Sequence, residues 1–434
     1  MGRGYEREES ILPTTWTMRT GAVLCAGILM AGCSTRDSTD ASAVASSDTG
    51  DQSTAAIDPA ALDTGDYPTT PAAPFGLATL DTLLDVETQR LAEFVTVPFE
   101  VDPELTDVKN PTMVLRTPSN LAAVLNEGVA QIASDNTMLY GYVTTAAVPK
   151  PSPNDSTRSL VNAVIRFGTT EAAAAASRQM HDNLTTVDSG SGLETPASID
   201  VLPDTLVSTQ RTDFSGPEVA VNAFTAHGTY VLYTYAKSPE AQKDWTATAV
   251  AKALSLQAPL IDRFPGTPTR EQNGGERPDY PLMDQDKILI YAIPEADPQA
   301  QGGDDMAVYG PRGMAHRSSN PPLTYKVLTE TGSEHNASYK TTVYRADDEA
   351  GAQRILNEFV DDQLSNGYTE APTPQGLPTA RCVSRETSQG PQEHCMVANG
   401  RYVGEASGLD NKTDVDQRIS AQYLILNWAD QNAK

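Results

Sequence analysis

Basic residues are scarce in this sequence. Of its 434 residues, 31 are lysine or arginine and 57 are aspartate or glutamate, so the formal net charge is −26. A surface with this excess of negative charge repels nucleic acid and anionic lipid headgroups. We therefore expect no DNA or RNA partner. The acidity is typical of a soluble exported protein, and a specific cationic partner is the alternative.

The motifs of common enzyme classes are missing as well. The sequence has no Gly-x-Ser-x-Gly, Ser-x-x-Lys, His-Glu-x-x-His, Gly-Lys or Cys-x-x-Cys. These absences argue against serine hydrolases, penicillin-binding enzymes, zinc proteases, P-loop proteins and thioredoxin-like oxidoreductases. We assign no catalytic residue, no metal ligand and no cofactor. An enzyme without a recognisable motif, such as a hydrolase, stays as the least favoured alternative.

An apolar segment near the start is too short to cross a membrane. Residues 21–31 form a run of about eleven residues after Arg19, whereas a spanning helix needs about 20. This length is typical of the apolar part of a secretory signal peptide. Ala31 and Gly32 then precede Cys33, as in the lipobox at which bacterial lipoprotein signal peptidase cleaves. The thiol is needed because the diacylglyceryl group is attached through a thioether.

We therefore predict a signal peptide over residues 1–32 and lipidation of Cys33, with palmitate in the anchor. The protein would lie on the extracytoplasmic face of the cell membrane, with that lipid as its membrane partner. Three glutamates before residue 10 are unusual in a signal peptide, so a natural start at Met18 is an alternative. The alternative interpretation of this apolar segment is a buried N-terminal helix that ends by chance in Ala-Gly-Cys.

The next segment, residues 34–74, has almost no large apolar side chain. It contains one arginine and seven aspartates. Such a chain buries too little surface to fold, and its charges repel one another. With Cys33 it is predicted to form a lipidated, disordered tether over residues 33–74.

Each of the four cysteines has an expected role. Cys25 leaves with the signal peptide, and Cys33 carries the lipid. Cys382 and Cys395 would pair in an oxidising envelope. Twelve residues lie between them, and closing such a loop contributes roughly 2–4 kcal/mol. A metal site beside His394 is the alternative, but no second ligand pair stands at zinc-binding spacing.

The body of the chain contains two similar stretches. In the first, a strand over residues 161–167 precedes a helix from Glu171 to about Asn183. A hairpin around His227-Gly228 and a helix over residues 244–264 follow. Pro259 should bend or break that last helix.

The second stretch repeats this order. A strand over residues 339–345 precedes a helix from Glu349 to Ser365, which Asn366-Gly367 should stop. A hairpin around Asn399-Gly400 follows, because Asn-Gly supplies two positive φ angles in a tight turn. A helix over residues 415–428 closes the copy.

The repetition predicts an α+β fold. We expect a tandem duplication of a strand–helix–strand–hairpin–helix unit with mostly antiparallel sheets. The domains would span residues 75–264 and 281–434, joined by a linker over residues 265–280. A helix capped at Thr117-Pro118 would precede the first copy, and a strand over residues 287–293 would precede the second.

Other polar residues have simple structural interpretations. The histidines are scattered and are interpreted as surface residues: His181, His227, His316, His335 and His394. Four carboxylate pairs could serve a hydrolase or bind calcium: Asp284/Asp286, Asp304-Asp305, Asp347-Asp348 and Asp361-Asp362. A helix start explains Asp347-Asp348 more simply, and a solvated helix face explains Asp361-Asp362. The loop that contains Asp304-Asp305 could hold calcium weakly. Tyr230, Tyr233 and Tyr235 are expected to pack within a sheet, with a ligand groove as the alternative.

Three segments resemble a known family. They are residues 62–71 (LDTGDYPTTP), residues 89–105 (QRLAEFVTVPFEVDPEL) and the terminal pattern of Cys382, Cys395 and residues 400–403. They resemble uncharacterised two-domain lipoproteins of mycolic-acid-bearing actinobacteria such as Nocardia, Rhodococcus and mycobacteria. The resemblance covers nearly all of the chain after Cys33. It implies a lipid anchor and two domains of unknown function, and it transfers no catalytic residue.

Three classes of function follow from these features. The favoured one is an envelope protein that binds or carries a lipid, glycan or peptide, because a tethered body without catalytic motifs suits that role. The second is a structural or accessory lipoprotein with a protein partner. A large apolar pocket would favour the first class, an exposed apolar patch the second, and a buried carboxylate pair of raised pKa an enzyme.

Overall fold

The structure is a computed structural model that describes residues 57–152, 155–188, 192–213, 216–295 and 306–433. The predicted signal peptide, the lipidation of Cys33, the first part of the tether and the pair Asp304-Asp305 lie outside these residues. Within them, no helix combines the length and the apolar character that a membrane span requires.

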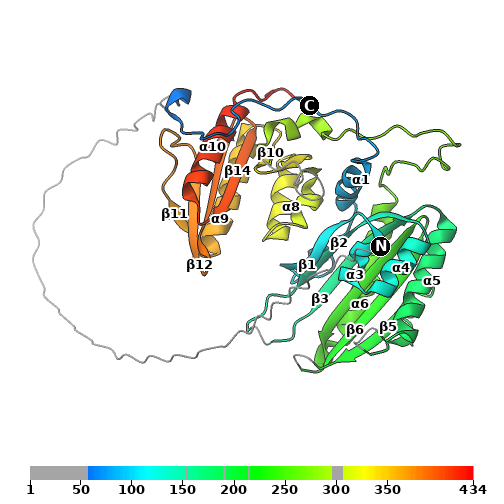
Figure 1. The fold of residues 1–434 in the computed structure, drawn as a ribbon. Coiled ribbons are helices and arrows are strands. Elements are labelled where there is room, and N and C mark those ends of the chain that lie inside the picture. Colours follow the sequence, from blue (N-terminus) through cyan, green and yellow to red (C-terminus); the bar gives the residue numbers. More distant parts are fainter. Residues whose placement is uncertain (1–56, 153–154, 189–191, 214–215, 296–305, 434) are drawn as a thin grey trace, which may run out of the picture. The chain divides into compact units, whose positions relative to one another are not determined.

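The first copy forms a seven-stranded sheet in the order β1-β2-β3-β7-β6-β5-β4, with every neighbouring pair antiparallel (Figure 1). The strands are β1 (Asp107–Leu115), β2 (Met138–Ala147), β3 (Ser159–Phe167), β4 (Thr195–Ala197), β5 (Leu206–Thr212), β6 (Glu218–His227) and β7 (Tyr230–Pro239). The helices are α1 (Leu83–Ala92), α2 (Pro98–Val101), α3 (Leu121–Val124), α4 (Glu127–Asp135), α5 (Thr170–Thr186) and α6 (Asp244–Ile261). Short 3-10 turns are η1 (Pro59–Ala61), η2 (Pro118–Asn120) and η3 (Glu240–Gln242).

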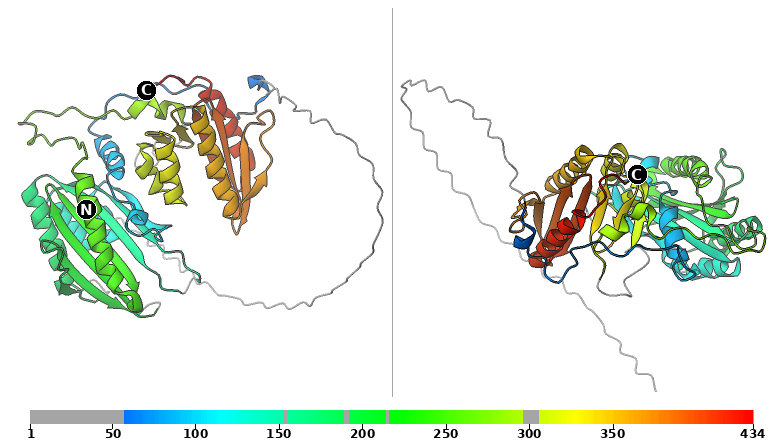
Figure 2. Two further views of the ribbon diagram at one scale, coloured as in Figure 1. Left: turned by 180° about the vertical axis from the view of Figure 1, so that it is seen from behind. Right: turned by 90° about the horizontal axis from the view of Figure 1, so that it is seen from above.

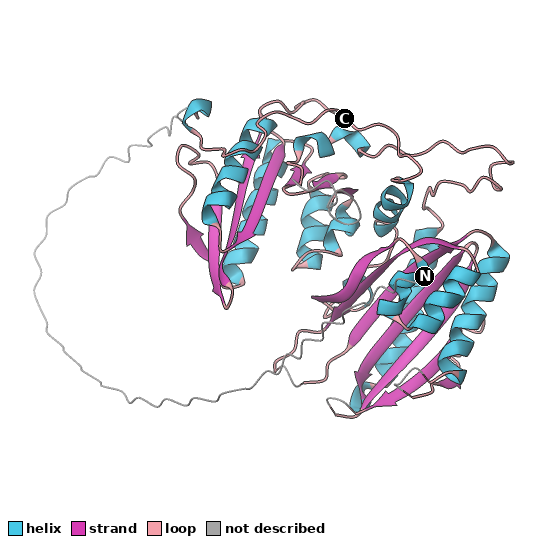
Figure 3. Cartoon of the chain, viewed as in Figure 1, coloured by secondary structure: helices cyan, strands magenta, loops and turns pink. Residues whose placement is uncertain are grey.

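The second copy forms another seven-stranded antiparallel sheet, in the order β8-β9-β10-β14-β13-β12-β11 (Figure 3). Its strands are β8 (Ala307–Tyr309), β9 (Asn336–Ser338), β10 (Thr342–Arg345), β11 (Thr369–Ala371), β12 (Arg381–Thr387), β13 (Gly390–Asn399) and β14 (Tyr402–Leu409). Its helices are α7 (Pro311–Ala315), α8 (Pro321–Glu330), α9 (Glu349–Ser365) and α10 (Lys412–Leu426), with 3-10 turns η4 (Gln285–Lys287) and η5 (Leu289–Tyr291). The two strand orders correspond position by position, which confirms the predicted tandem α+β fold.

Each sheet carries helices on both faces (Figure 2). Successive residues of a strand point to opposite faces. In β6, Phe224 packs into the core beneath α5, and its neighbour Ala223 packs into the core with α6. In β13, Met396 packs beneath α9, and Cys395 lies on the α10 face. Alternate residues of a strand therefore pack in different cores, one under α5 or α9 and the other under α6 or α10.

The long helices begin and end where their capping residues predict. The side chain of Thr169 accepts a hydrogen bond from the backbone N–H of Ala172 at the start of α5. Asp348 does the same for Gly351 at the start of α9. Gly367, just after the end of α9, has a φ of +87°. These caps satisfy backbone groups that a helix end leaves without partners.

The hairpin turns lie one residue later than predicted. The strand register pairs His227 with Tyr230 and Asn399 with Tyr402, so the central residues of the second turn are Gly400 and Arg401. Gly400 has a φ of +54°, whereas Asn399 is an ordinary strand residue. The prediction that Asn-Gly forms the turn was therefore wrong, because cross-strand pairing sets the register.

The predicted strand over residues 287–293 is also wrong. The segment forms the two 3-10 turns η4 and η5, and its apolar residues are largely buried. The carboxylate of Asp284 accepts hydrogen bonds from the backbone N–H groups of Leu289 at 2.7 Å and Ile290 at 3.2 Å. A short apolar run does not distinguish a strand from another buried segment, and the Asp284 contacts favour the turn.

Two helix predictions need correction. The helix expected after Thr117 is interrupted at Leu125, which has a φ of −129° and a ψ of −90°. Asn126 then caps a new helix, α4, because its side chain accepts from the N–H of Val129 at 2.9 Å. Pro259 does not break α6, which continues to Ile261.

The described part of the predicted tether is folded. Ile57 and Leu62 pack into the core on the α10 face, and the hydroxyl of Tyr67 donates to Asp414. The N–H of Ala72 donates to the carbonyl of Ile290 at 2.8 Å. The prediction of disorder from composition is therefore wrong for residues 57–74. The segment is polar, but its few apolar side chains pack against residues that lie hundreds of positions away in the sequence.

Candidate ligand-binding pocket

A pocket of about 560 Å³ opens beside helix α1. Its walls are the start of α1, the first residues of β2 and the segment 265–280. Pockets of this volume accommodate small molecules. The segment that the sequence presented as an inter-domain linker therefore forms one wall of the pocket.

One side of the pocket is apolar. Leu80, Leu83, Leu84 and Leu139 line it. Leu80 is 73% exposed and Leu84 is 38% exposed, although large apolar side chains are usually buried. Leu83 and Leu84 begin α1, and Leu80 lies in the turn that precedes it. An apolar ligand would remove these exposed surfaces from water.

Two arginines also line the pocket. Arg270 Nε donates to the carbonyl of Gly275 at 2.5 Å, and the guanidinium of Arg277 lies 4.3 Å from the ring centre of Tyr280. Among the residues that the structure describes, neither arginine forms an ion pair with a carboxylate. Each guanidinium therefore keeps N–H donors for an anionic group.

Glu87, which lines the pocket and is 1% exposed, lies at the centre of a polar network. Its carboxylate accepts from the hydroxyl of Tyr140 at 2.7 Å, and from the N–H and hydroxyl of Thr267 at 2.9 and 3.0 Å. Arg90 pairs with it directly, and Arg166 lies 3.7 Å away. Burial, followed by the charge of Glu87, raises the pKa of Tyr140 well above its usual range. The network fixes the pocket wall to α1.

Sequence reasoning missed this pocket. The leucine spacing in residues 80–84 was a usable signal, and so were Arg270 and Arg277 within an otherwise acidic chain. Neither signal shows that the two groups face one another, because more than 180 residues separate them. Only the fold brings the segment 265–280 against α1.

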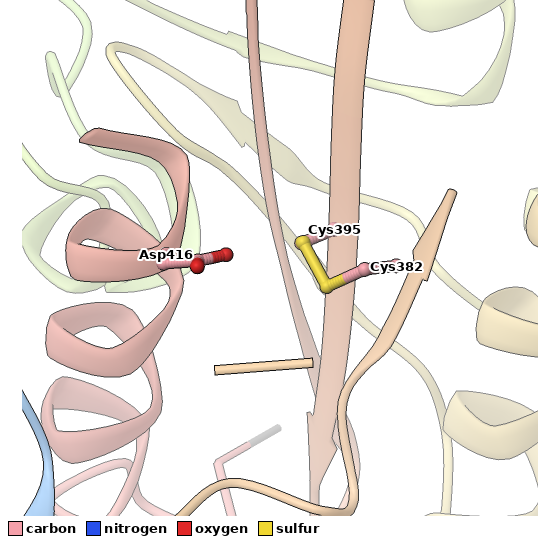
Figure 4. Close-up of side chains that lie close together, drawn as sticks. All are labelled: Cys382, Cys395 and Asp416. Carbon is pink, nitrogen blue, oxygen red and sulfur yellow. A yellow bond between two sulfur atoms is a disulfide. The ribbon is translucent and has the colours of Figure 1, made fainter. Parts of the chain in front are cut away.

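The predicted disulfide is present. Cys382 and Cys395 lie directly opposite each other on β12 and β13, and their Cα atoms are 4.1 Å apart. Both residues are buried against α10, and the carboxylate of Asp416 lies beside the two sulfurs (Figure 4). Because the sulfurs are bonded to each other, they are not available as thiolate ligands for zinc.

Removing the disulfide should destabilise the protein without preventing folding. In the double variant Cys382→Ala/Cys395→Ala we expect the free energy of unfolding to fall by roughly 2–4 kcal/mol, since the unfolded chain regains the entropy of the closed loop. Denaturant unfolding with and without a reductant would measure this loss. The first copy has Ala223 at the equivalent position, so the fold itself tolerates alanine. A variant that does not fold would contradict this expectation.

The histidines do not all lie on the surface as predicted. His227 and His335 pair with Asp262 at 2.6 Å and Asp286 at 2.5 Å. His316 is fully buried, and His394 is 11% exposed on the α9 face of the second sheet. The side chain of His181 is 12% exposed, and its Nε2 lies 3.2 Å from the carbonyl of Val207. The prediction is wrong for His181, His316 and His394, because a single histidine in the sequence carries no periodic signal of burial.

The described carboxylates serve structural roles. Asp284 holds the turn before η5, Asp286 pairs with Arg345 at 3.1 Å, and Asp348 caps α9. Asp361 pairs with Arg381 at 3.1 Å. Asp362 was expected on a solvated helix face, but it lines a cleft.

The tyrosines of the first hairpin pack in the core. The ring centres of Tyr233 and Phe224 lie 4.9 Å apart, and Tyr235 packs against the same cluster. Tyr230 lies in a different cluster. Core packing is therefore confirmed over the alternative of a ligand groove.

The fold and the pocket define a tandem α+β protein with a cavity of ligand size. Residues 76–275 match the N-terminal domain, and residues 285–428 the C-terminal domain, of DUF7373, a domain of unknown function. The chain belongs to this family. A comparison with curated proteins found no match.

One solved structure with a partial likeness is the extracellular domain of PknH from Mycobacterium tuberculosis. It covers 45% of this chain and 100% of its own length, with 13% sequence identity and a TM-score of 0.29. A likeness of this degree supports no argument about function.

Proposed function

We propose that this protein is a lipid-anchored envelope protein that binds an amphiphile with an apolar chain and an anionic headgroup in the pocket beside α1. The observation that carries the proposal is that one pocket is lined both by exposed leucines and by two arginines without carboxylate partners among the described residues. The leucines would contact the chain, and the arginines would bind the headgroup.

The two halves of the pocket act on different parts of such a ligand. Burial of apolar surface contributes about 25 cal/mol per Å², so the leucine wall favours a hydrocarbon over water. An arginine presents a planar set of N–H donors that matches a carboxylate or phosphate. Neither a fully polar ligand nor an uncharged hydrocarbon would use both halves.

The anchor on Cys33 and the location at the membrane rest on the sequence. The apolar segment, Ala31-Gly32-Cys33 and the polar stretch that follows support the anchor. A binding site close to a membrane would have lipid as an abundant ligand, which accords with the chemistry of the pocket.

Palmitate, which has an anionic head and a long chain, is a direct test of the pocket. Residues 34–434 would be purified, stripped of bound lipid and titrated with palmitate, followed by native mass spectrometry. We expect one tightly bound molecule per chain. Leu84→Asp should weaken binding at least tenfold, because it places a carboxylate against the hydrocarbon, and tenfold corresponds to about 1.4 kcal/mol. Arg270→Gln/Arg277→Gln should do the same by removing the headgroup contacts.

Matched controls separate the pocket from general surface effects. Leu193→Asp changes another leucine that is 54% exposed, and Arg211→Gln changes an arginine whose side chain is 73% exposed. Both should bind palmitate as the unchanged chain does. Equal binding by the pocket variants and the controls, or no binding at all, would refute the proposal.

A protein partner is the second candidate, and exposed leucines favour it. Leu77 and Leu282 are 59% and 52% exposed and pair with each other as an isolated bridge. With Leu80 they give an apolar surface beside the pocket, as interaction sites often do. Crosslinking on intact cells that captures one protein, and that Leu77→Asp abolishes while palmitate binding stays unchanged, would favour this candidate.

A further inference from the structure

The second copy contains a cleft of about 590 Å³ on the α9 face of its sheet. Residues of β9, β10, β12, β13, β14, α7, α8 and α9 line it. It shares no lining residue with the pocket beside α1. Most of its lining is polar, whereas the adjoining core beneath α9 is apolar.

Comparison with the first copy explains why this cleft is open. By strand register, Glu405 corresponds to Tyr233, and Ser407 corresponds to Tyr235. In the first copy the two tyrosine rings fill this position, and Tyr233 is only 3% exposed. The second copy has replaced two aromatic rings by a carboxylate and a hydroxymethyl group. The duplicated fold therefore does not require a cavity here.

The polar groups at the base of the cleft are largely buried. The hydroxyl of Tyr344 donates to Glu405 Oε2 at 2.6 Å. His394 Nε2 lies 3.4 Å from Glu405 Oε1 without the geometry of a hydrogen bond, and it has no other hydrogen-bond partner among the described residues. His394 corresponds to Asn222 of the first copy, which donates to Glu194 at 2.9 Å. A buried imidazole nitrogen without a partner is costly unless a ligand or water satisfies it.

The upper part of the cleft combines acceptors, donors and an aromatic face. Asp362 accepts from the side chain of Asn320 at 2.6 Å and keeps further lone pairs. The guanidinium of Arg385 lies 4.6 Å from the ring centre of Tyr368 and donates to Gln392 at 3.0 Å. The two carboxylates and two arginines that line the cleft balance in charge, which favours a neutral ligand over an ion.

We propose that the cleft of the second copy binds a neutral saccharide. A sugar hydroxyl is both a donor and an acceptor, so it can donate to Glu405 and Asp362 while accepting from His394 and Arg385. A hydrocarbon would leave these buried polar groups without partners, which costs free energy. The site is separate from the proposed lipid pocket and does not depend on it.

An array of neutral mono- to tetrasaccharides of hexoses and pentoses would test this proposal with the chain from residue 34 onward. We expect at least one saccharide to bind, and isothermal titration calorimetry would then give its Kd. Glu405→Gln and Asp362→Asn should each raise the Kd at least tenfold. The double variant Glu405→Tyr/Ser407→Tyr restores the residues of the first copy, and it should abolish binding because the rings fill the cleft.

Two controls keep the result interpretable. Glu386→Gln changes an exposed residue on the opposite face of β12 from Arg385 and should leave saccharide binding unchanged. Palmitate binding should be the same in all these variants, which shows that the rest of the protein is folded. If no saccharide of the array binds, or if the filled cleft binds as well as the open one, the proposal is wrong.

Discussion

The stability advantage of His316 over glutamine at the same position should shrink as the pH falls from about 6.5 to about 3. Burial, followed by the charge of Arg312, lowers the pKa of His316 from 6.5 to about 3. The unfolded chain therefore takes up a proton near pH 6.5, and the folded chain does not until about pH 3. Because the unfolded state binds more protons in this range, the stability that His316 contributes is complete above pH 6.5 and is lost as the pH decreases.

The contacts of His316 explain why the neutral ring is preferred. Its Nε2–H donates to the carbonyls of Ala92 and Val95, both at 3.1 Å, and its Nδ1 accepts from the hydroxyl of Thr144 at 2.9 Å. The side chain thus joins the second copy to α1 and β2 of the first. A second proton would place a charge in a fully buried site that already faces Arg312.

Denaturant unfolding of the unchanged chain and of His316→Gln at several pH values would measure this effect. We expect the difference in the free energy of unfolding to decrease by about 1.4 kcal/mol per pH unit within the window. The comparison needs the variant, because burial also raises the pKa of Glu93 to about 7. Protonation of Glu93 stabilises the folded state as the pH falls, which is opposite to the effect of His316. This contribution is the same in the unchanged chain and in His316→Gln, so it cancels when their free energies of unfolding are subtracted.

His227→Gln is the matched control for this measurement. His227 is paired with Asp262 at the surface, and its side chain is 33% exposed. The difference between this variant and the unchanged chain shows how much of any slope comes from removing a histidine that is not buried. A His316→Gln difference that stays constant or widens at low pH would contradict the expectation.

Replacing Glu87 with glutamine should lower the free energy of unfolding by about 3–5 kcal/mol. Glu87 is 1% exposed, and Arg166 beside it is 4% exposed. Removing one partner of a buried ion pair leaves the other charge buried without compensation, which is strongly destabilising. The substitution keeps the size of the side chain, so the loss reports on the charge rather than on a cavity.

Two comparisons would test this interpretation of Glu87. Glu330→Gln breaks a surface pair with Arg354, whose side chain is 35% exposed, and should cost much less than Glu87→Gln because solvent screens the pair. The double variant Glu87→Leu/Arg166→Met removes both buried charges and should recover part of the loss. A double variant less stable than Glu87→Gln alone would show that the network stabilises through its hydrogen bonds instead.

The equivalent position in the second copy repeats this arrangement with less burial. Arg345 corresponds to Arg166 by register and pairs with Asp286, whose side chain is 36% exposed. Both arginines precede the start of the long helix of their copy. In each copy, a buried arginine thus pairs with a carboxylate from an element that precedes it in the chain, which is α1 in the first copy and η4 in the second.

Local sequence signals determined the tandem α+β fold. The spacing of apolar residues, the caps Thr169 and Asp348 and the stop at Gly367 depend on neighbours in the chain, so they could be interpreted without a structure. The disulfide followed from counting cysteines. The repeat order also allowed the two sheets to be compared strand by strand.

Tertiary structure alone decided the rest. The folding of residues 57–74, the burial of His316 and the turn over residues 285–291 depend on partners far away in the sequence. The same is true of the pocket beside α1, where residues 80–84 meet residues 267–280, and of the cleft, where two tyrosines of one copy are absent from the other. Periodicity and composition describe a segment by itself, whereas burial and binding depend on which segments pack together.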